Sequence, residues 1–147
     1  IKEANAIIVV DKLPKIKGVV FQLEQLFTNL LSNALKYRSI SDTPKIRIQY
    51  EKAPASELPG HVIKLSKYYH KISFVDNGIG FATKHAEKIF EVFQRLHQKT
   101  EYSGTGIGLA ICKKIVENHN GYIYAKGEVG VGAEFVIYLP AEMNSFR

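Results

Sequence analysis

Two asparagines and a lysine, spaced along one predicted helix, carry the first chemical signal in this sequence. In the stretch Gln25–Tyr37, Asn29 and Asn33 lie one helical turn apart and Lys36 follows on the same face. Asparagine lowers helix stability by roughly half a kcal/mol relative to alanine, because its amide competes for backbone hydrogen bonds. Two amide oxygens beside an ammonium group would suit the ligation of a cation next to a phosphate. Taken alone, the pattern also fits the solvated face of an amphipathic helix.

A carboxylate followed by two spaced glycines forms the second signal. Asp76 ends an apolar run, and Gly78 and Gly80 come directly after it. Glycine permits positive φ and lets the backbone approach a ligand closely. An ionised carboxylate only accepts hydrogen bonds, so Asp76 requires a donor such as the exocyclic amine of adenine or a neighbouring lysine. A tight turn that contains an aspartate explains the same residues, so the motif is weak by itself.

The third signal is a run of glycines that opens a second predicted helix. Gly104, Gly106 and Gly108 precede an apolar stripe that starts at Leu109. Such a turn offers free backbone N–H groups and the positive end of the helix dipole, which together bind phosphate. It is not a P-loop, since no Gly-Lys-Ser/Thr follows, and it lacks the preceding strand of a dinucleotide fingerprint.

Apolar periodicity predicts the elements that must position these groups. Besides the helix that carries the asparagines, we expect helices at Thr83–Phe93 and from Leu109 to a stop at Asn120–Gly121. The apolar stripe of the first helix consists of Leu23, Leu26, Phe27, Leu30, Leu31 and Ala34. Strands are expected at Ala6–Val10, Ile16–Val20, Lys45–Lys52, Val62–Ser66, Lys71–Val75, Tyr122–Lys126 and Glu134–Leu139. Clean alternation in Lys45–Lys52 indicates an antiparallel or mixed sheet with one wet face.

Composition sets the outer limits. The 147 residues, 46% of them hydrophobic, fit one ordinary globular domain over residues 1–147 with a core of about 6–140. No apolar run approaches the length of a membrane span. The chain starts at Ile1 rather than Met, so we expect a piece of a longer protein. The net charge of +6 favours anionic partners, although the lysines are dispersed. The single cysteine, Cys112, excludes an internal disulfide and is expected to be buried.

In their order and separation, the three motifs resemble the ATP-binding catalytic domain of sensor histidine kinases, in the superfamily shared with Hsp90, DNA gyrase and MutL. The resemblance covers about Ala6 to Pro140. Its four boxes are the N box at Asn29–Tyr37, the G1 box at Asp76–Gly80, the F box at Ile89–Leu96 and the G2 box at Gly104–Ala110. The run Ile89–Ile115 is especially similar to kinases attached to PAS or phytochrome-type sensors.

The resemblance implies an α+β fold, a two-layer α/β sandwich of the Bergerat type. A mixed sheet of about five strands would lie under three helices, with ATP held between helices and a flexible lid. Asn33 would be the main Mg²⁺ ligand and Asn29 would help to hold metal and phosphate. Lys36 would pair with phosphate oxygens, and Tyr37 would lie near the nucleotide.

The remaining positions of the resemblance describe the base and the lid. Asp76 would accept from the adenine amine, and Gly78 and Gly80 would let the backbone bend around the base. The lid positions that would bind nucleotide are Gly104, Thr105, Gly106, Gly108 and Leu109. Arg95 would reach the γ-phosphate, which makes Asn33, Lys36 and Arg95 the expected catalytic group. Such chemistry requires little beyond positioning and charge neutralisation.

Two positions distinguish this chain within the resemblance. In the Hsp90, gyrase and MutL group, a glutamate four residues before the metal asparagine activates water. Asn29 occupies that position here, and an amide is no general base at neutral pH, so we expect phosphoryl transfer and only slow hydrolysis. Ala133 stands where the family usually has Ser or Thr facing the base, so one hydrogen bond to the nucleotide is missing.

The phosphate acceptor is not expected in this chain. Its histidines, none of which has the context of a phosphorylated helix or a zinc-ligand spacing, are His61, His70, His85, His97 and His119. The resemblance implies an acceptor histidine on a dimerisation domain of the same parent, which passes the phosphoryl group to a response regulator. It implies a cytoplasmic domain without contact to nucleic acid or membrane, whether or not the parent is anchored in a membrane.

Four alternatives remain open from the residues. A degenerate module that binds nucleotide or nothing is opposed by the filled boxes, with Ala133 the one loss. An ATPase like Hsp90 or MutL is opposed by Asn29. A basic nucleic-acid-binding domain rests on the charge alone. A serine kinase of the anti-sigma type shares the pocket.

Overall fold

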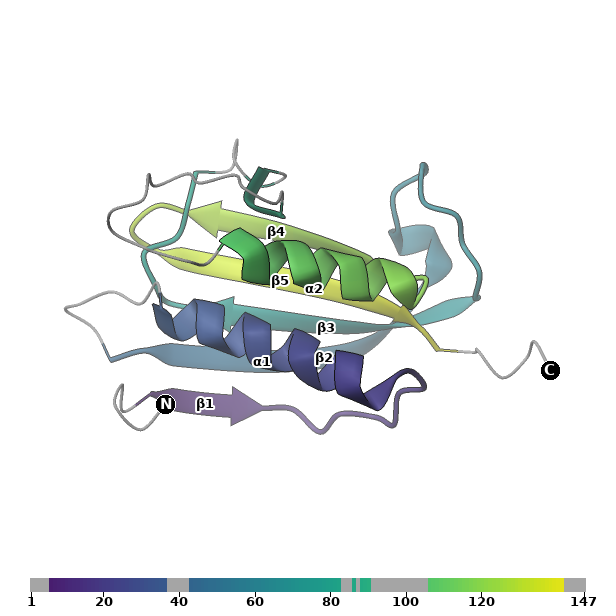
Figure 1. The fold of residues 1–147 in the computed structure, drawn as a ribbon, viewed down its shortest axis with the longest axis horizontal. Helices are drawn as coiled ribbons and strands as arrows, with labels where there is room; N and C mark the ends of the chain where they lie inside the picture. The colour runs from purple at the N-terminus through teal and green to yellow at the C-terminus, as the bar shows by residue number, and fades with distance from the viewer. Residues whose placement is uncertain (1–5, 37–42, 83–85, 87, 91–105, 142–147) are drawn as a thin grey trace.

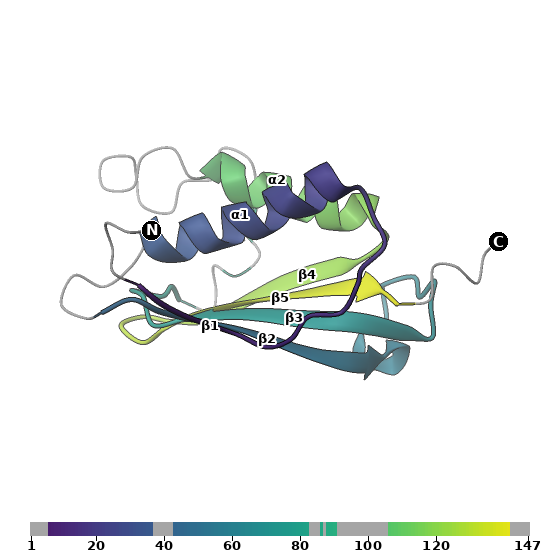
Figure 2. The ribbon, with the colours of Figure 1, turned by 90° about the horizontal axis from the view of Figure 1, so that it is seen from below.

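The fold has two layers in the computed structural model, which describes residues 6–36, 43–82, 86, 88–90 and 106–141. Within these residues, five strands form one sheet, and two α-helices lie across one of its faces (Figures 1 and 2). The elements are β1 (Ile7–Val10), α1 (Val20–Lys36), β2 (Lys45–Pro54), the 3-10 helix η1 (Ala55–Glu57), β3 (Tyr68–Asp76), the 3-10 helix η3 (Lys88–Phe90), α2 (Gly106–Asn118), β4 (Tyr122–Glu128) and β5 (Gly132–Pro140). Neither α1 nor α2 is long and apolar enough to span a membrane.

The sheet is mixed, as expected, and β3 is its central strand. The strand order is β1-β2-β3-β5-β4, with β1 parallel to β2 and the other pairs antiparallel. The register places Asp76 opposite Ile46 on β2 and opposite Ala133 on β5. Asp76 therefore ends a strand whose backbone is held from both sides.

Helix α1 buries the apolar stripe expected from its periodicity. Leu26, Leu30 and Ala34, one turn apart, are at most 7% exposed. Phe27 meets Phe74 of β3 edge-on, with 5.3 Å between the ring centroids. Full burial of a leucine contributes about 1.5–3 kcal/mol, so these contacts hold α1 on the sheet.

Helix α2 packs beside α1 and ends where the sequence predicts. Cys112 and Val116 are fully buried. Asn120 has the left-handed φ of 62° and donates from its N–H to the Glu117 carbonyl at 3.0 Å, while the Gly121 N–H donates to the Val116 carbonyl at 2.9 Å. These two bonds form a Schellman motif, which confirms Asn120–Gly121 as the helix stop.

His119 ties the end of α2 to the start of α1. Its Nε2 accepts from the Val19 N–H at 3.0 Å, and its Nδ1 lies 2.8 Å from the Ile115 carbonyl oxygen. The tautomer with its proton on Nδ1 satisfies both contacts. A Cβ at Gly18 would lie 2.6 Å from the imidazole ring, so the chain needs glycine where it passes His119. His119 is a packing histidine, as expected.

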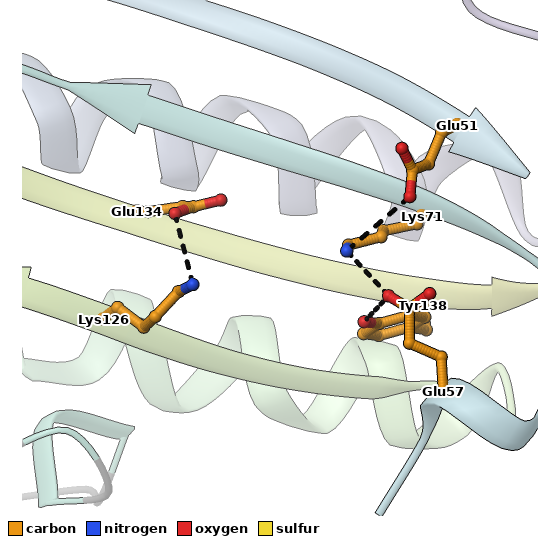
Figure 3. Close-up of polar contacts among 6 residues, drawn as sticks. All are labelled: Glu51, Glu57, Lys71, Lys126, Glu134 and Tyr138. Carbon is orange, nitrogen blue, oxygen red and sulfur yellow. Dashed lines mark hydrogen bonds and ion pairs between the residues drawn. The ribbon is translucent and has the colours of Figure 1, made fainter. Parts of the chain in front are cut away.

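The sheet face opposite the helices carries a polar network of its own (Figure 3). Lys71 Nζ lies 2.7 Å from Glu57 Oε2 and 3.8 Å from Glu51 Oε2, and the Tyr138 hydroxyl donates to Glu57 at 2.7 Å. The hydrogen bond from Lys71 holds the pKa of Glu57 below its usual value. The network fastens η1 to the sheet and pairs one of the chain's excess cations internally.

The expected third helix is wrong for the described residues, which contain two α-helices. Within Thr83–Phe93 the described part is a turn and the 3-10 helix η3, and the rest of that segment lies outside the described residues. Ile89 and Phe90, which make the segment look helical, are 8% and 6% exposed. Phe90 meets Phe135 edge-on, with 6.0 Å between centroids. A single 3-10 turn buries these two adjacent side chains without the α-helical period.

Two of the expected strands are also wrong. Residues 16–19 have no strand, and Ile16 packs against the core from the connection between β1 and α1. Residues 62–66 form no strand because both edges of β3 are already paired, with β2 and β5. There the Leu65 N–H donates to the Tyr69 hydroxyl at 3.0 Å instead. The other five expected strands are confirmed, with ends shifted by up to three residues.

Candidate functional site

The ends of two helices and one strand lie together at one end of the sandwich. The C-terminal ends of β3 and α1 and the N-terminal end of α2 lie on the left in Figure 1. Asp76 closes β3, Asn33 and Lys36 belong to the last turn of α1, and Gly106 and Gly108 belong to the first turn of α2. The fold thus brings the three sequence motifs into one region.

The Asp76 carboxyl group is held by backbone donors at the edge of the core. The Gly78 N–H donates to Asp76 Oδ1 at 2.8 Å, and the Ala133 N–H is a second donor. Burial nevertheless raises the pKa of Asp76 above its usual value, since it outweighs these two bonds. A carboxylate has about four acceptor positions, so Asp76 retains capacity for a ligand amine.

The turn between β4 and β5 clamps the loop that follows Asp76. Gly80 has φ 72°, and a Cβ there would collide with the Glu128 carbonyl oxygen and lie 2.8 Å from that of Gly132. A Cβ at Gly132 would in turn collide with the Asp76 carbonyl oxygen. The Gly130 N–H donates to the Ile79 carbonyl at 2.8 Å. Gly80 and Gly132 are required because the two loops are in close contact. The sequence motif alone does not reveal this role.

Asn77 is a positioning residue that the sequence analysis missed. Its Oδ1 accepts from the Lys45 N–H at 2.8 Å, and its Nδ2 donates to the Thr43 carbonyl at 3.0 Å. The loop after β3 is thereby fastened to the start of β2. Its place between Asp76 and Gly78 was the available signal, because asparagine side chains commonly pair with nearby backbone groups.

The asparagine pair lies on a half-buried edge of α1. Asn29 and Asn33 are both half-buried. The Cys112 thiol of α2 donates to the carbonyl oxygen of Leu26 at 3.9 Å, one turn before Asn29, so this edge of α1 lies near the neighbouring helix. Lys36 is the last residue of α1, one turn further along.

The first turn of α2 is anchored to the core on one side. Leu109 is 8% exposed and belongs to the main core together with Ile89 and Phe90 of η3. Among the described residues, no atom would lie within 4 Å of a Cβ at Gly108. Since the first N–H groups of a helix have no intrahelical partner, this turn can donate to an anion.

Several expected positions cannot be compared with the fold. Tyr37, Arg95, Gly104 and Thr105 lie outside the described residues, as does the lid segment at residues 91–105.

The described histidines make local packing contacts. His70 Nδ1 lies 2.9 Å from the Tyr50 hydroxyl, and burial lowers the pKa of His70. The ring of His61 lies 6.1 Å from that of Tyr122, centroid to centroid. The other two histidines, His85 and His97, belong to the residues without a described structure.

The groups present fit a nucleotide and its cation. Asp76 offers an acceptor for a base amine, and the start of α2 offers donors for phosphate. In the described part of the chain, no three His, Cys, Asp or Glu residues come together as a metal site. A cation at this end would be held by the amide oxygens of Asn29 and Asn33 and by phosphate, which suits Mg²⁺ because it prefers oxygen ligands and binds substrate phosphates.

Sequence comparison places the chain in a known family. The family described as "Histidine kinase-, DNA gyrase B-, and HSP90-like ATPase" matches residues 18–143. Cyanobacterial phytochrome A from Nostoc sp. (strain PCC 7120) is 42% identical over 140 residues, which are 95% of this chain and 16% of the phytochrome. The sensor protein kinase WalK from Staphylococcus aureus is 36% identical over 126 residues, 83% of this chain and 27% of WalK. The chain thus spans a minor part of the length of these relatives.

Solved structures agree on the fold. The mycobacterial sensor histidine kinase MprB superposes with a TM-score of 0.72 at 22% identity, covering 95% of this chain and 84% of that one. Full-length ShkA in complex with AMPPNP gives a TM-score of 0.69 at 25% identity, covering 95% of this chain and 26% of that one. The chain belongs to the histidine kinase-, DNA gyrase B- and HSP90-like ATPase family, and within it to the ATP-binding catalytic domains of sensor histidine kinases, with cyanobacterial phytochromes among its relatives.

Proposed function

We propose that this domain binds Mg-ATP and donates the γ-phosphoryl group to a histidine on a separate dimerisation domain of its parent kinase. The observation that carries the proposal is that the C-terminal ends of β3 and α1 and the start of α2 lie at one end of the fold (Figure 1). Asp76, Asn33 and Gly106 belong to these ends, and Asn29 lies one turn before Asn33 on α1. A base acceptor, cation ligands and phosphate donors are the three requirements of a nucleotide site. The AMPPNP bound by the related ShkA supports an adenine nucleotide as the ligand.

Each of the described residues binds a different part of the nucleotide. Asp76 accepts from the adenine amine, and its two backbone donors fix the direction of the carboxyl group. Asn33, with Asn29 beside it, ligates Mg²⁺, which neutralises phosphate charge when it is bound. Lys36 pairs with phosphate oxygens, and the first turn of α2 donates from its backbone through Gly106 and Gly108.

The remaining assignments rest on the resemblance of the sequence motifs. Tyr37 lies near the nucleotide, and Arg95 reaches the γ-phosphate. Gly104 and Thr105 complete the lid side of the site, together with Leu109. Residues 1–147 act as one catalytic domain.

The chemistry we propose is transfer rather than hydrolysis. The bond between the γ-phosphorus and the oxygen of the leaving ADP breaks, and a bond to the imidazole nitrogen of the acceptor forms. Asn29 occupies the position of the water-activating glutamate of the hydrolysing relatives, and its amide takes no proton at neutral pH. The domain therefore turns over ATP slowly when no acceptor is present.

The partners follow from the parent protein. The related phytochrome is far longer than this chain, which leaves room for the dimerisation domain on which the acceptor histidine lies. From that histidine the phosphoryl group passes to a response regulator. Because the site requires ATP, we place the domain in the cytoplasm.

The test combines this chain with a dimerisation domain of a sensor histidine kinase that carries the acceptor histidine, and supplies ATP labelled in its γ-phosphate. We expect Mg²⁺-dependent, acid-labile label on the dimerisation domain, and its loss in Asn33→Ala. Wild-type chain that binds no nucleotide would establish the degenerate-module alternative. Rapid release of labelled phosphate without labelled protein would establish the ATPase alternative.

A further inference from the structure

The pairing of β2 with β3 ends on a side chain rather than on the backbone. The register pairs Ile46 with Asp76, so the next pair along the two strands is Lys45 with Asn77. The Asn77 N–H donates to the Lys45 carbonyl oxygen at 3.3 Å, as one half of a regular antiparallel pair. The other half differs, because the Lys45 N–H donates at 2.8 Å to Oδ1 of the Asn77 side chain instead of to its main-chain carbonyl.

The second polar atom of the same amide replaces the next hydrogen bond of the ladder. A continued register would place Ile79 opposite Thr43. The Thr43 carbonyl oxygen accepts instead from Nδ2 of Asn77 at 3.0 Å. Ile79 is paired elsewhere, since its carbonyl oxygen accepts from the Gly130 N–H of the turn between β4 and β5 at 2.8 Å. The Asn77 side chain thus continues the pairing with β2 while the backbone leaves the sheet.

This departure from the sheet sets the direction of the Asp76 carboxyl group. The Gly78 N–H, directly after Asn77, donates to Asp76 Oδ1 at 2.8 Å. In a continued strand this N–H would lie in the plane of the sheet, whereas the side chain of Asp76 stands out of that plane. The hydrogen bond to the carboxyl group therefore requires the turn, and the turn is fastened to β2 by the amide of Asn77.

We propose that Asn77 is a specificity-determining residue, whose amide maintains the turn that directs the Asp76 carboxyl group at the amine of adenine. The inference rests on the proposed function, because it assumes that Asp76 recognises the base. Asn77 acts through Asp76 and is a positioning residue. Without its amide, residues 77–79 can pair with β2 through their own backbone, which withdraws the Gly78 N–H from the carboxyl group.

Two substitutions separate the two hydrogen bonds of the amide. Asn77→Asp has nearly the same shape and keeps an acceptor for the Lys45 N–H, but it has no donor for the Thr43 carbonyl. Asn77→Ala removes both bonds. Tyr138→Phe is the matched control, because it also removes a side-chain hydrogen bond from this sheet, the one to Glu57 at 2.7 Å, on the face opposite the helices.

The experiment measures the affinities of ATP and GTP for the wild type and the three variants, together with each thermal midpoint. The ratio of the two affinities reports on the base, since both nucleotides carry the same sugar and triphosphate and respond alike to an added charge. We expect the ratio of ATP to GTP affinity to fall about tenfold or more in Asn77→Ala and about threefold or more in Asn77→Asp, because they lose two hydrogen bonds and one. Tyr138→Phe should lower the thermal midpoint and keep the wild-type ratio.

Three results would overturn the inference. A folded Asn77→Ala with the wild-type ratio would show that the amide does not direct Asp76. A ratio within about twofold of the wild type in Asn77→Asp would show the same, and this variant decides alone where Asn77→Ala does not fold. An equal fall in Tyr138→Phe would assign the effect to a general loss of stability. A wild type that binds ATP no more tightly than GTP would contradict the proposed function itself, so the two failures are distinguishable.

Discussion

The ionised side chain of Asp76 lowers the stability of the unliganded protein. Its carboxyl group receives two backbone hydrogen bonds, and burial still raises its pKa. The ionised form is therefore less favourable in the folded protein than in the unfolded chain at neutral pH. Such a cost is typical of a group that is arranged for a ligand rather than for stability. A base amine that donates to the carboxylate would offset it.

Lowering the pH should stabilise the wild type relative to Asp76→Asn. A raised folded pKa means that the native state binds this proton more tightly than the unfolded chain does. The contribution is complete below the ordinary pKa of 3.8 and is lost as the pH rises through the raised value. Denaturant unfolding of both proteins, from neutral pH down towards 3.8, measures the difference. A difference that is constant with pH, or that shifts in favour of the variant, would contradict the burial of this carboxyl group.

At the scale of elements, the site depends on contact between two loops. The loop after β3 and the turn between β4 and β5 approach so closely that neither Gly80 nor Gly132 has room for a Cβ. Asn77 fastens the same loop to the start of β2. The position of Asp76 is therefore set by its two neighbouring strands, β2 and β5, and by the turn between β4 and β5, rather than by its own loop alone.

Gly80→Ala should destabilise the protein clearly more than Gly130→Ala. Both residues have positive φ, 72° and 81°, so both variants carry the left-handed penalty of about 1–2 kcal/mol. Only the Gly80 variant must also displace the backbone of Glu128, because a Cβ at Gly130 would meet no atom of the described residues within 4 Å. Denaturant unfolding of the pair isolates the clamp between the loops. An equal loss of unfolding free energy in the two variants would exclude a close contact between the loops.

Long periodic segments were predictable from the sequence, and short apolar ones were not. The stripe through Leu26 and Leu30 and the alternation in β2 each fix a buried face, and both are confirmed. Residues 62–66 look like a strand, but the sheet has no free edge beside β3 for them. Ile89 and Phe90 look helical, but a 3-10 turn buries them. Ile16, Ile89 and Phe90 reach the core without a full regular element, whereas Ile63 and Leu65 of the third segment stay exposed.

Some residues of the site could be predicted from the sequence and others could not. Motif positions such as Asp76 and Asn33 were recognisable because their types and spacing are unusual for turns and helices. The residues that support the site were not recognisable, because the Asn77 bridge, the contact between the two loops and the Cys112–Leu26 contact join residues that are distant in sequence. Cys112 was expected to be buried, and this is confirmed, but burial alone did not reveal its hydrogen bonds.

At the scale of the whole molecule, the two faces of the sheet are covered by different parts of the chain. One face carries α1 and α2, whose ends meet β3 at the candidate site (Figure 1). The other face is occupied by the segment around η1 and by the Lys71–Glu57–Tyr138 network (Figure 3). The nucleotide site that we propose lies at one end of the helical layer.

Calorimetric titration of ATP, ADP and GTP, with and without Mg²⁺, tests the central claim most directly. The wild type should bind adenine nucleotides selectively and bind ATP more tightly with Mg²⁺. Asp76→Asn should weaken ATP by about tenfold or more, since an unpaired buried polar group costs about 1–3 kcal/mol. Asn33→Ala should remove the Mg²⁺ dependence. Equal affinity for ATP and GTP, or no binding of any nucleotide by the folded wild type, would contradict a site that reads adenine through Asp76.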